Sequence, residues 1–163
     1  MPRTISNTSP FQYLHQIGQL ELLPALVQNV LVPPAVVDEL AAGRAMGLDL
    51  PSPEALPWVT IQAPASMAAL PLVRDLGPGE SQALALALEY PGAVVILDDK
   101  LGRHVARSLS VLHTGTLGVL IDAKRAGLLP AVAPLIDRLH ACGFRLTAKA
   151  RQAVLNVAGE TAR

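Results

Sequence analysis

Two adjacent carboxylates, Asp98 and Asp99, follow directly on the apolar run 94–97 and precede a basic stretch that begins at Lys100. Such a run is typical of a strand buried on both faces, and open α/β sheets bind ligands beyond the carboxyl ends of these strands. The pattern therefore favours a metal-dependent active site. It is equally typical of an ordinary turn or helix start, where Asp is a common residue.

Two further carboxylates are candidates for the same site. Glu39 falls in a predicted helix after the second predicted strand, and Glu80 falls in the first turn of another. Alone, each has an ordinary explanation, as part of a solvated helix face or as a favourable charge near a helix N-terminus. Together they indicate more, because strand ends and helix starts of a parallel α/β fold converge on one edge. Carboxylates gathered there repel one another unless a hard cation such as Mg²⁺ or Mn²⁺ lies between them.

Other kinds of active site find little support in the sequence. The four histidines lack the spacing of a zinc site, and no glycine-rich phosphate loop is present. Ser9 and His15 could pair as nucleophile and base, but the glycine-flanked turn that exposes such a serine is missing. Because Cys142 is the sole cysteine, the chain forms no intrachain disulfide and no thiolate metal cluster.

Short apolar runs and helical periodicities alternate along the chain and define the elements that must position these residues. Strands are predicted at 3–6, 30–32, 58–61, 93–97 and 111–113, and helices at 20–27, 77–88, 101–109, 117–126, 131–141 and 148–158, with two more starting at Ser9 and Pro34. The alternation predicts the α/β class, with a central parallel sheet of about four to five strands in a three-layer α/β/α arrangement. The segment 43–57 lacks periodicity and is expected to be irregular and mobile.

The length of 163 residues fits a single domain over 1–163, with a core over about 4–139 and a C-terminal helical extension over 140–163. Although 51% of the residues are hydrophobic, no run approaches the roughly 20 apolar residues of a membrane span. The first residues contain no signal-peptide apolar region. We therefore expect a soluble, cytoplasmic protein without a membrane partner.

Charge is distributed unevenly although the net charge is zero. Three basic and ten acidic residues precede Lys100, whereas ten basic and three acidic residues lie from Lys100 onward. This favours an acidic site in the first part and a surface for a polyanion in the second, with solvated helix faces as the alternative. Lys100, Arg103, His104 and Arg107 are spaced to share one face of the helix beside Asp99, where they can bind phosphate. With five aromatic residues in the chain, base stacking is not expected to dominate recognition.

Five segments, taken in order, resemble the PIN-domain proteins, and among these the VapC-like branch often described only as predicted nucleic-acid-binding proteins of unknown function. The segments are 5–10 (ISNTSP), 33–40 (PPAVVDEL), 77–80 (GPGE), 97–103 (LDDKLGR) and 114–120 (TGTLGVL). The resemblance covers about residues 4–139. It implies a metal-dependent ribonuclease fold with acidic residues around one or two Mg²⁺ or Mn²⁺ ions.

The resemblance also implies roles for individual residues. Glu39, Glu80 and Asp99 match the second, third and fourth acids of the family pattern, and Asp98 ranks second to Asp99 as a metal ligand. Asn7 stands where the family has its first acid, so the site has one negative charge fewer and is expected to bind metal more weakly. Thr8 or Ser9 matches the small hydroxyl residues after the first strand of the family, and Thr116 matches its hydroxyl-bearing region after the fifth. Together with Lys100, Arg103 and Arg107, whose helical spacing indicates phosphate binding, these residues are expected to contact substrate.

The leading hypothesis is hydrolysis of RNA phosphodiesters by metal-activated water, with Asn7, Glu39, Glu80 and Asp99 as the catalytic set. The resemblance to VapC-like proteins further implies a toxin that is held inactive by a small cognate antitoxin and that forms a homodimer. An alternative, favoured by Asn7, is a catalytically silent PIN-like domain that binds RNA or a protein. A phosphatase or receiver-like domain using Asp98 and Asp99 is a third reading, but it would need the acidic pair after the first strand.

Overall fold

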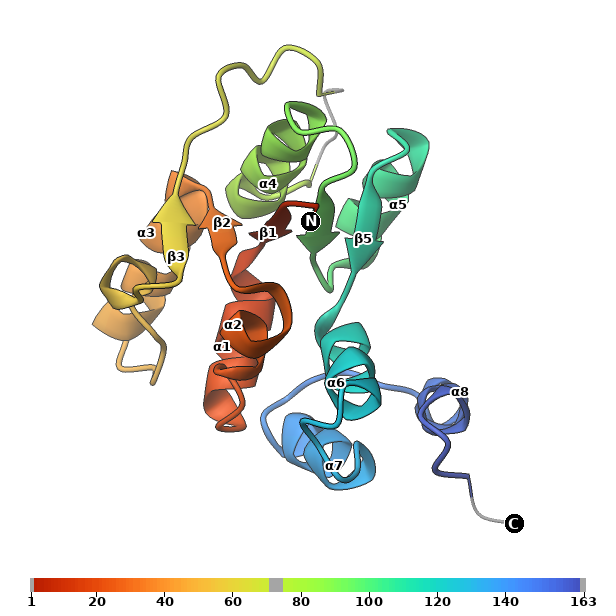
Figure 1. Cartoon of the computed structure of the whole chain (residues 1–163). Helices are drawn as coiled ribbons and strands as arrows, with labels where there is room; N and C mark the ends of the chain where they lie inside the picture. Colours follow the sequence, from red (N-terminus) through yellow and green to blue (C-terminus); the bar gives the residue numbers. More distant parts are fainter. Residues whose placement is uncertain (1, 71–74, 162–163) are drawn as a thin grey trace.

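The computed structural model describes residues 2–70 and 75–161 (Figure 1). Within these residues, five short strands form one sheet: β1 (Thr4–Ser6), β2 (Val30–Val32), β3 (Val59–Ile61), β4 (Val94–Ile96) and β5 (Leu112–Thr114). The strand order is β3-β2-β1-β4-β5, and every neighbouring pair is parallel. Parallel strands need crossover connections, which the intervening helices provide.

Helices lie on both sides of this sheet. They are α1 (Thr8–Gln16), α2 (Leu22–Val27), α3 (Pro34–Ala45), α4 (Pro78–Leu88), α5 (Lys100–Ser108), α6 (Thr116–Arg125), α7 (Ala133–Ala141) and α8 (Ala148–Val157), with a 3₁₀ turn, η1 (Pro53–Ala55). One core contains side chains of α1, α2, α3, α6 and α7, and a second contains side chains of α4 and α5. The predicted fold class, a three-layer α/β/α domain around a parallel sheet, is confirmed.

Strand side chains divide between the two cores in strict alternation. Ile5, Leu31 and Val95 are neighbours in register and belong to the core with α4 and α5. Val32 and Ile96 point the other way, into the larger core. Because both faces are covered, β2 and β4 consist of apolar residues alone, which is the pattern of strands buried in a parallel sheet. β1, between them, is also buried but has the polar residues Thr4 and Ser6 on one face.

The expectation for segment 43–57 was wrong at its start, because α3 continues through residue 45. The chain then returns over this helix, and a Cβ atom at Gly43 would lie 2.4 Å from Leu50 Cδ1. Gly43 is therefore explained by the close approach of Leu50, which outweighs the low helix propensity of glycine. From 46 to 57 the chain is irregular apart from η1, as expected.

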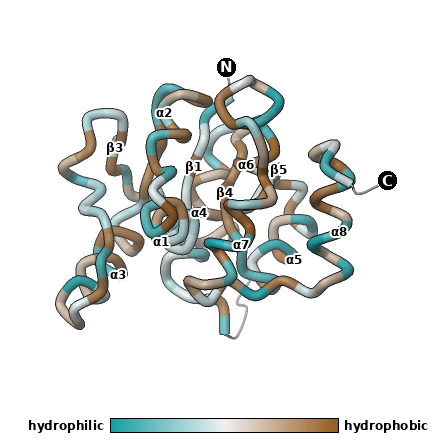
Figure 2. Tube along the Cα trace, turned by 90° about the horizontal axis from the view of Figure 1, so that it is seen from below, coloured by the Kyte–Doolittle hydropathy of each residue, from teal (hydrophilic) through white to brown (hydrophobic). Residues whose placement is uncertain are grey.

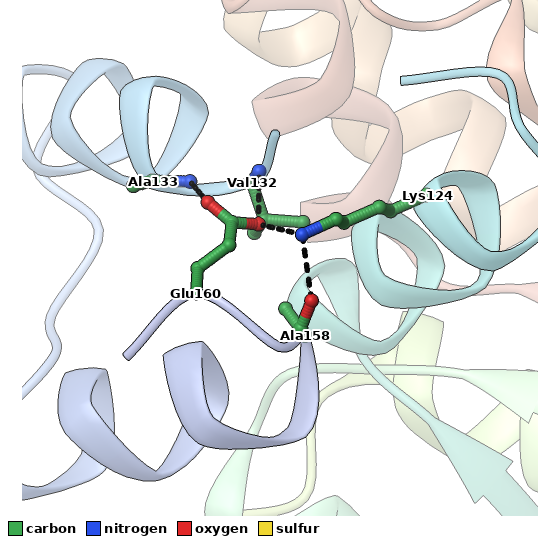
Figure 3. A network of polar contacts seen from close by, with 5 residues as sticks. All are labelled: Lys124, Val132, Ala133, Ala158 and Glu160. Carbon is green, nitrogen blue, oxygen red and sulfur yellow. Dashed lines mark hydrogen bonds and ion pairs between the residues drawn. The ribbon is translucent and has the colours of Figure 1, made fainter. Parts of the chain in front are cut away.

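A half-buried carboxylate ties the C-terminal segment to α6 and to the start of α7 (Figure 3). Glu160 accepts hydrogen bonds from the backbone N–H groups of Val132 (2.7 Å) and Ala133 (3.0 Å) and from Lys124 Nζ (2.9 Å), which also donates to Ala158 O (2.6 Å). Burial acts to raise the pKa of the Glu160 carboxyl, but these hydrogen bonds and the charge of Lys124 outweigh it and hold the pKa below its ordinary value.

Whether residues 140–163 form an extension separate from the 4–139 core stays a prediction.

Hydrophobic and hydrophilic residues are interleaved along the helices (Figure 2). No helix among the described residues is long and apolar enough to cross a membrane.

Candidate functional site

The candidate residues gather at the carboxyl edge of the sheet. β1 lies at its centre, with β2 on one side and β4 on the other, so the direction of chain progression reverses between β1 and β4. Ligands of open α/β sheets bind at such a switch point. Asn7 directly follows β1, and Asp98 and Asp99 follow β4 after one intervening residue.

Helix N-termini converge on the same edge, and the carboxylates are directed at them. Three carboxylates accept backbone N–H groups in the first turn of a helix: Asp99 from Gly102 in α5 (2.7 Å), Glu39 from Gly79 in α4 (2.9 Å) and Asp98 from Thr116 in α6 (2.7 Å). These N–H groups have no partner within their own helix, and the helix dipole favours negative charge beside them. The helix starts therefore hold several carboxylates in place at one edge.

Asn7, Glu80 and Glu39 form one group around the start of α4. Asn7 Nδ2 donates to Glu80 Oε1 (3.0 Å), and Thr8 Oγ1 donates to Glu39 Oε1 (2.8 Å). Asn7 is 1% exposed, and its Oδ1 is buried without a hydrogen-bond partner among the described residues. A Cβ atom at Gly79 would lie 2.7 Å from Asn7 Oδ1 and from both oxygens of Glu39. Glycine at 79 therefore allows α4 to approach three oxygen atoms. One of them, Asn7 Oδ1, accepts no hydrogen bond from a described residue.

Asp98 and Asp99 form the second group, and their environments differ. Asp98 is half-buried; its Oδ2 accepts hydrogen bonds from Thr116 Oγ1 (2.7 Å) and Ser9 Oγ (3.3 Å), in addition to the Thr116 N–H bond at Oδ1. Asp99 is exposed, and within the described residues only its Oδ2 is hydrogen-bonded. Thr116, expected to contact substrate, is fully buried and directed at Asp98. Asp98 is thus engaged on both oxygens, whereas Asp99 retains an oxygen that faces solvent.

The two groups meet at Gly102. A Cβ atom at this position would lie 3.4 Å from Asp99 Oδ2 and also 3.4 Å from Glu80 Cγ, so the two acidic side chains approach Gly102 together. Glu80, Asp98 and Asp99 line one cleft of about 750 Å³. The remaining lining residues are Ser9, Tyr13, Lys100, Gly143, Phe144 and Arg145.

This set of side chains has the donor chemistry that Mg²⁺ or Mn²⁺ requires. All its donors are hard oxygen atoms, which these cations take as ligands. The unpartnered Oδ1 of Asn7, packed against the Glu39 carboxylate at Gly79, is a buried donor atom of the right kind. In the conformation described for 2–70 and 75–161, no three acidic, histidine or cysteine side chains are close enough together to enclose an ion. The residues therefore fit a divalent ion in the chemistry of their donor atoms, but the described side chains would have to move closer together to enclose one.

The predicted phosphate-binding cations are only partly brought to this cleft. Lys100 lines it, and Arg103 lines an adjoining cleft of about 490 Å³ that also contains Asp98 and residues of α6 and α8. Arg107 lies in the last turn of α5 and lines neither cleft. All three side chains are exposed, and none forms an ion pair with a described residue. Lys100 and Arg103 are therefore placed to meet an anionic ligand, whereas Arg107 is remote from it.

Three cleft residues were not anticipated from the sequence. Tyr13 of α1 packs edge to face against Phe144, with 5.0 Å between ring centroids and 81° between planes, and Arg145 follows in the same connection between α7 and α8. Burial raises the pKa of the Tyr13 hydroxyl, as do the charges of Asp98 and Cys142, while Arg145 acts in the opposite sense. The sequence signal that could have found Phe144 and Arg145 is an aromatic residue next to a cation in the connection between two helices.

An all-parallel sheet in this order, with acidic residues at its switch point, defines an α/β protein with a candidate divalent-metal site. A family model described as a PIN domain (DUF3368) matches residues 3–160. The chain therefore belongs to the PIN-domain family, whose members are generally nucleases, and the resemblance found in the sequence is confirmed at this level. Comparison with curated proteins and with solved structures gives no match.

Proposed function

We propose that the protein is a Mg²⁺- or Mn²⁺-dependent ribonuclease of the PIN type, of the VapC-like branch. The observation that carries this proposal is the gathering of Glu39, Glu80, Asp98 and Asp99 at the switch point without an ion pair to any described cationic side chain. Uncompensated carboxylates at one edge repel one another, and a divalent cation relieves that repulsion.

The residues divide into ligands and residues that position them. Glu39, Glu80 and Asp99 would hold the ion, with Asn7 contributing its Oδ1 atom. Asp98, which is hydrogen-bonded on both oxygens, would support the site through Ser9 and Thr116. When bound, the ion lowers the pKa of water and offsets the charge that develops on the phosphate.

Substrate would be held by side chains around this edge. Lys100 and Arg103 would bind phosphates on either side of Asp98, because they line the two clefts that share this residue. Thr8 and Ser9 are half-buried hydroxyls beside the acids, and both now donate to carboxylates. Their main role would therefore be to position the carboxylates, and contact with the RNA would be secondary.

A second candidate function is a catalytically silent PIN domain that binds RNA or a protein. The hydrogen bond from Asn7 Nδ2 to Glu80 Oε1 favours it, because the amide occupies an oxygen that an ion would otherwise use. An asparagine also brings no negative charge to the site. Cleavage activity separates the two candidates.

The decisive variant is Asp99→Asn, assayed for cleavage of structured RNAs in Mn²⁺ and in EDTA. Asn caps helices as well as Asp does, so the start of α5 is retained while the charge is lost. Supporting residues around metal sites cost about 10- to 100-fold when mutated, so a direct ligand should cost about 100-fold or more in cleavage rate.

The matched control is Asp122→Asn in α6, an exposed aspartate that lines a separate pocket formed by the starts of β1 and β4. It should cleave at the wild-type rate and unfold at the wild-type temperature. Undiminished cleavage by a highly purified Asp99→Asn protein would exclude the proposed site.

The proposal extends to partners on the strength of the VapC-like resemblance alone. A small cognate antitoxin would inhibit the enzyme, and two copies of the chain would form a homodimer. Light scattering of the purified protein checks the second point, with a monomeric mass as the contrary result.

A further inference from the structure

Two segments that are far apart in the sequence meet at the wall of the acidic cleft. Tyr13 comes from the first helix, and Phe144 and Arg145 come from the connection between α7 and α8. All three line the same cleft as Glu80 and Asp99. The cleft thus has an acidic side at the sheet edge and a side built from an aromatic pair and a guanidinium.

This aromatic pair differs from the other aromatic residues of the chain. Phe11 and Trp58 are buried and stack on each other in the core, with 5.9 Å between centroids and 13° between planes. Tyr90 lies under the guanidinium of Arg3, next to the start of β4. Tyr13 and Phe144 are only half-buried, and an edge-to-face pair engages one face of one ring. Both rings also pack against the core, and the part of each ring that lines the cleft is the surface that a flat ligand could contact.

The charges around the pair suit a nucleotide. Arg145 and Lys100 both line the cleft, are exposed, and form no ion pair with a described residue. Cations of this kind bind phosphate oxygens, and arginine does so with two parallel hydrogen bonds. Unpaired bases stack on aromatic side chains, which is how proteins commonly hold single-stranded RNA.

We infer that Tyr13, Phe144 and Arg145 form a subsite for one unpaired nucleotide beside the carboxylates, with its base stacked on the aromatic pair and its phosphate held by Arg145. The inference rests on the proposed ribonuclease function and adds to it the residues that would hold one unpaired base and its phosphate beside the carboxylates. A paired base cannot present its face to the rings, so the subsite excludes continuous duplex.

Binding of a fluorescein-labelled single-stranded RNA hexamer, followed by fluorescence anisotropy in Ca²⁺, tests the subsite without requiring cleavage. Ca²⁺ is also bound by oxygen ligands, and a gel verifies that the hexamer stays intact. Phe144→Leu and Tyr13→Leu should each weaken binding about 5- to 100-fold, the range for loss of one stacked base. Tyr13→Phe keeps the ring and should bind as the wild type does. Tyr90→Leu, which removes a half-buried ring next to the start of β4, is the matched control and should not change binding.

A hexamer series with one abasic nucleotide at each position in turn separates stacking from general loss of structure. At the position that occupies the subsite, the abasic hexamer should bind the wild type as weakly as the intact hexamer binds Phe144→Leu. The two changes combined should weaken binding no further. Arg145→Gln should weaken all hexamers alike and reduce the salt dependence of binding by about one phosphate contact.

The subsite is overturned if the wild type does not bind the hexamer, if the leucine variants bind as tightly as wild type, or if abasic and leucine changes are additive at every position. Absence of RNA cleavage, with the aromatic dependence of binding intact, would refute the ribonuclease proposal and leave the subsite standing.

Discussion

Two regions of this molecule use carboxylates at helix N-termini, and they differ in what balances the charge. At the C-terminal end, Glu160 accepts the N–H groups of Val132 and Ala133 at the start of α7 and is paired with Lys124. Its side chain is 13% exposed. The half-buried charge is thus hydrogen-bonded and neutralised by Lys124, as a structural carboxylate requires.

At the carboxyl edge of the sheet, the same kind of hydrogen bond occurs without the cation. Glu39, Asp98 and Asp99 accept N–H groups from helix starts, yet no described lysine, arginine or histidine is ion-paired with them. The buried Oδ1 of Asn7 even lacks a donor. The contrast indicates that local helix geometry explains where each carboxylate lies, whereas the lack of an ion pair among the described residues is what supports the cation site proposed at the sheet edge.

The largest effect on stability is expected at Glu160. Glu160→Ala removes the carboxylate partner of the half-buried Lys124, which keeps only its bond to Ala158 O, and removes the acceptor of two backbone N–H groups, so the free energy of unfolding should fall by about 2–4 kcal/mol. Urea unfolding followed by circular dichroism measures it. Glu21→Ala, at an exposed glutamate without a capping hydrogen bond from its side chain, should change the unfolding free energy by less than about 0.5 kcal/mol. Equal stabilities of the two variants would refute a structural role for Glu160.

A smaller effect, on metal affinity, sharpens the other half of the comparison. Asn7→Asp adds a fifth carboxylate at this edge and removes the amide that now donates to Glu80, so Mn²⁺ should bind about tenfold more tightly or better. Isothermal titration calorimetry measures the affinity. Without metal the variant should be less stable than the wild type, because the new carboxylate is buried beside Glu80.

The control for Asn7→Asp is Asn156→Asp on α8, which adds the same charge at an exposed position. It should leave Mn²⁺ affinity unchanged. If Asn7→Asp also leaves the Mn²⁺ affinity unchanged, Asn7 is not a metal ligand and the metal site proposed at the sheet edge does not include it.

The architecture and the location of the site could be predicted from the sequence because both depend on local patterns. Apolar runs such as 94–97 mark buried strands, and parallel strands place their carboxyl ends at one edge. Asn7 and Asp99 follow strands and Glu80 begins a helix, so their place at this edge was predictable before any contact was known. Glu39 lies in the second turn of α3, and its hydrogen bond to the start of α4 could not be predicted from its position. Their roles as ligands stay predictions, because the side chains are engaged in hydrogen bonds in the structure.

Contacts between distant segments could not be predicted in this way. The pairing of Tyr13 with Phe144 joins the first helix to a connection near the other end of the chain, and no periodicity in either segment points to the other. The same holds for Glu160, whose partners lie on α6 and before α7. Gly43 looked like the start of an irregular segment because glycine is a poor helix former, and the Leu50 contact that explains it is invisible in the sequence.

The smallest effect concerns pH and tests whether the Glu160 carboxylate is stabilised by its surroundings as described. Because the pKa of Glu160 in the folded protein lies below its ordinary value of 4.5, its contribution to stability is fully present above that value and is lost as the pH falls through the folded pKa. The difference in unfolding free energy between the wild type and Glu160→Gln should therefore be constant from about pH 7 to pH 6 and shrink below pH 4.5. Urea unfolding at a series of pH values measures it, and Glu21→Gln serves as the control at an exposed glutamate. A difference that grows on acidification would mean that the folded protein favours the neutral form of the Glu160 carboxyl. Lys124 and the two N–H groups would then not balance its charge, and Glu160 would no longer differ from the carboxylates at the sheet edge.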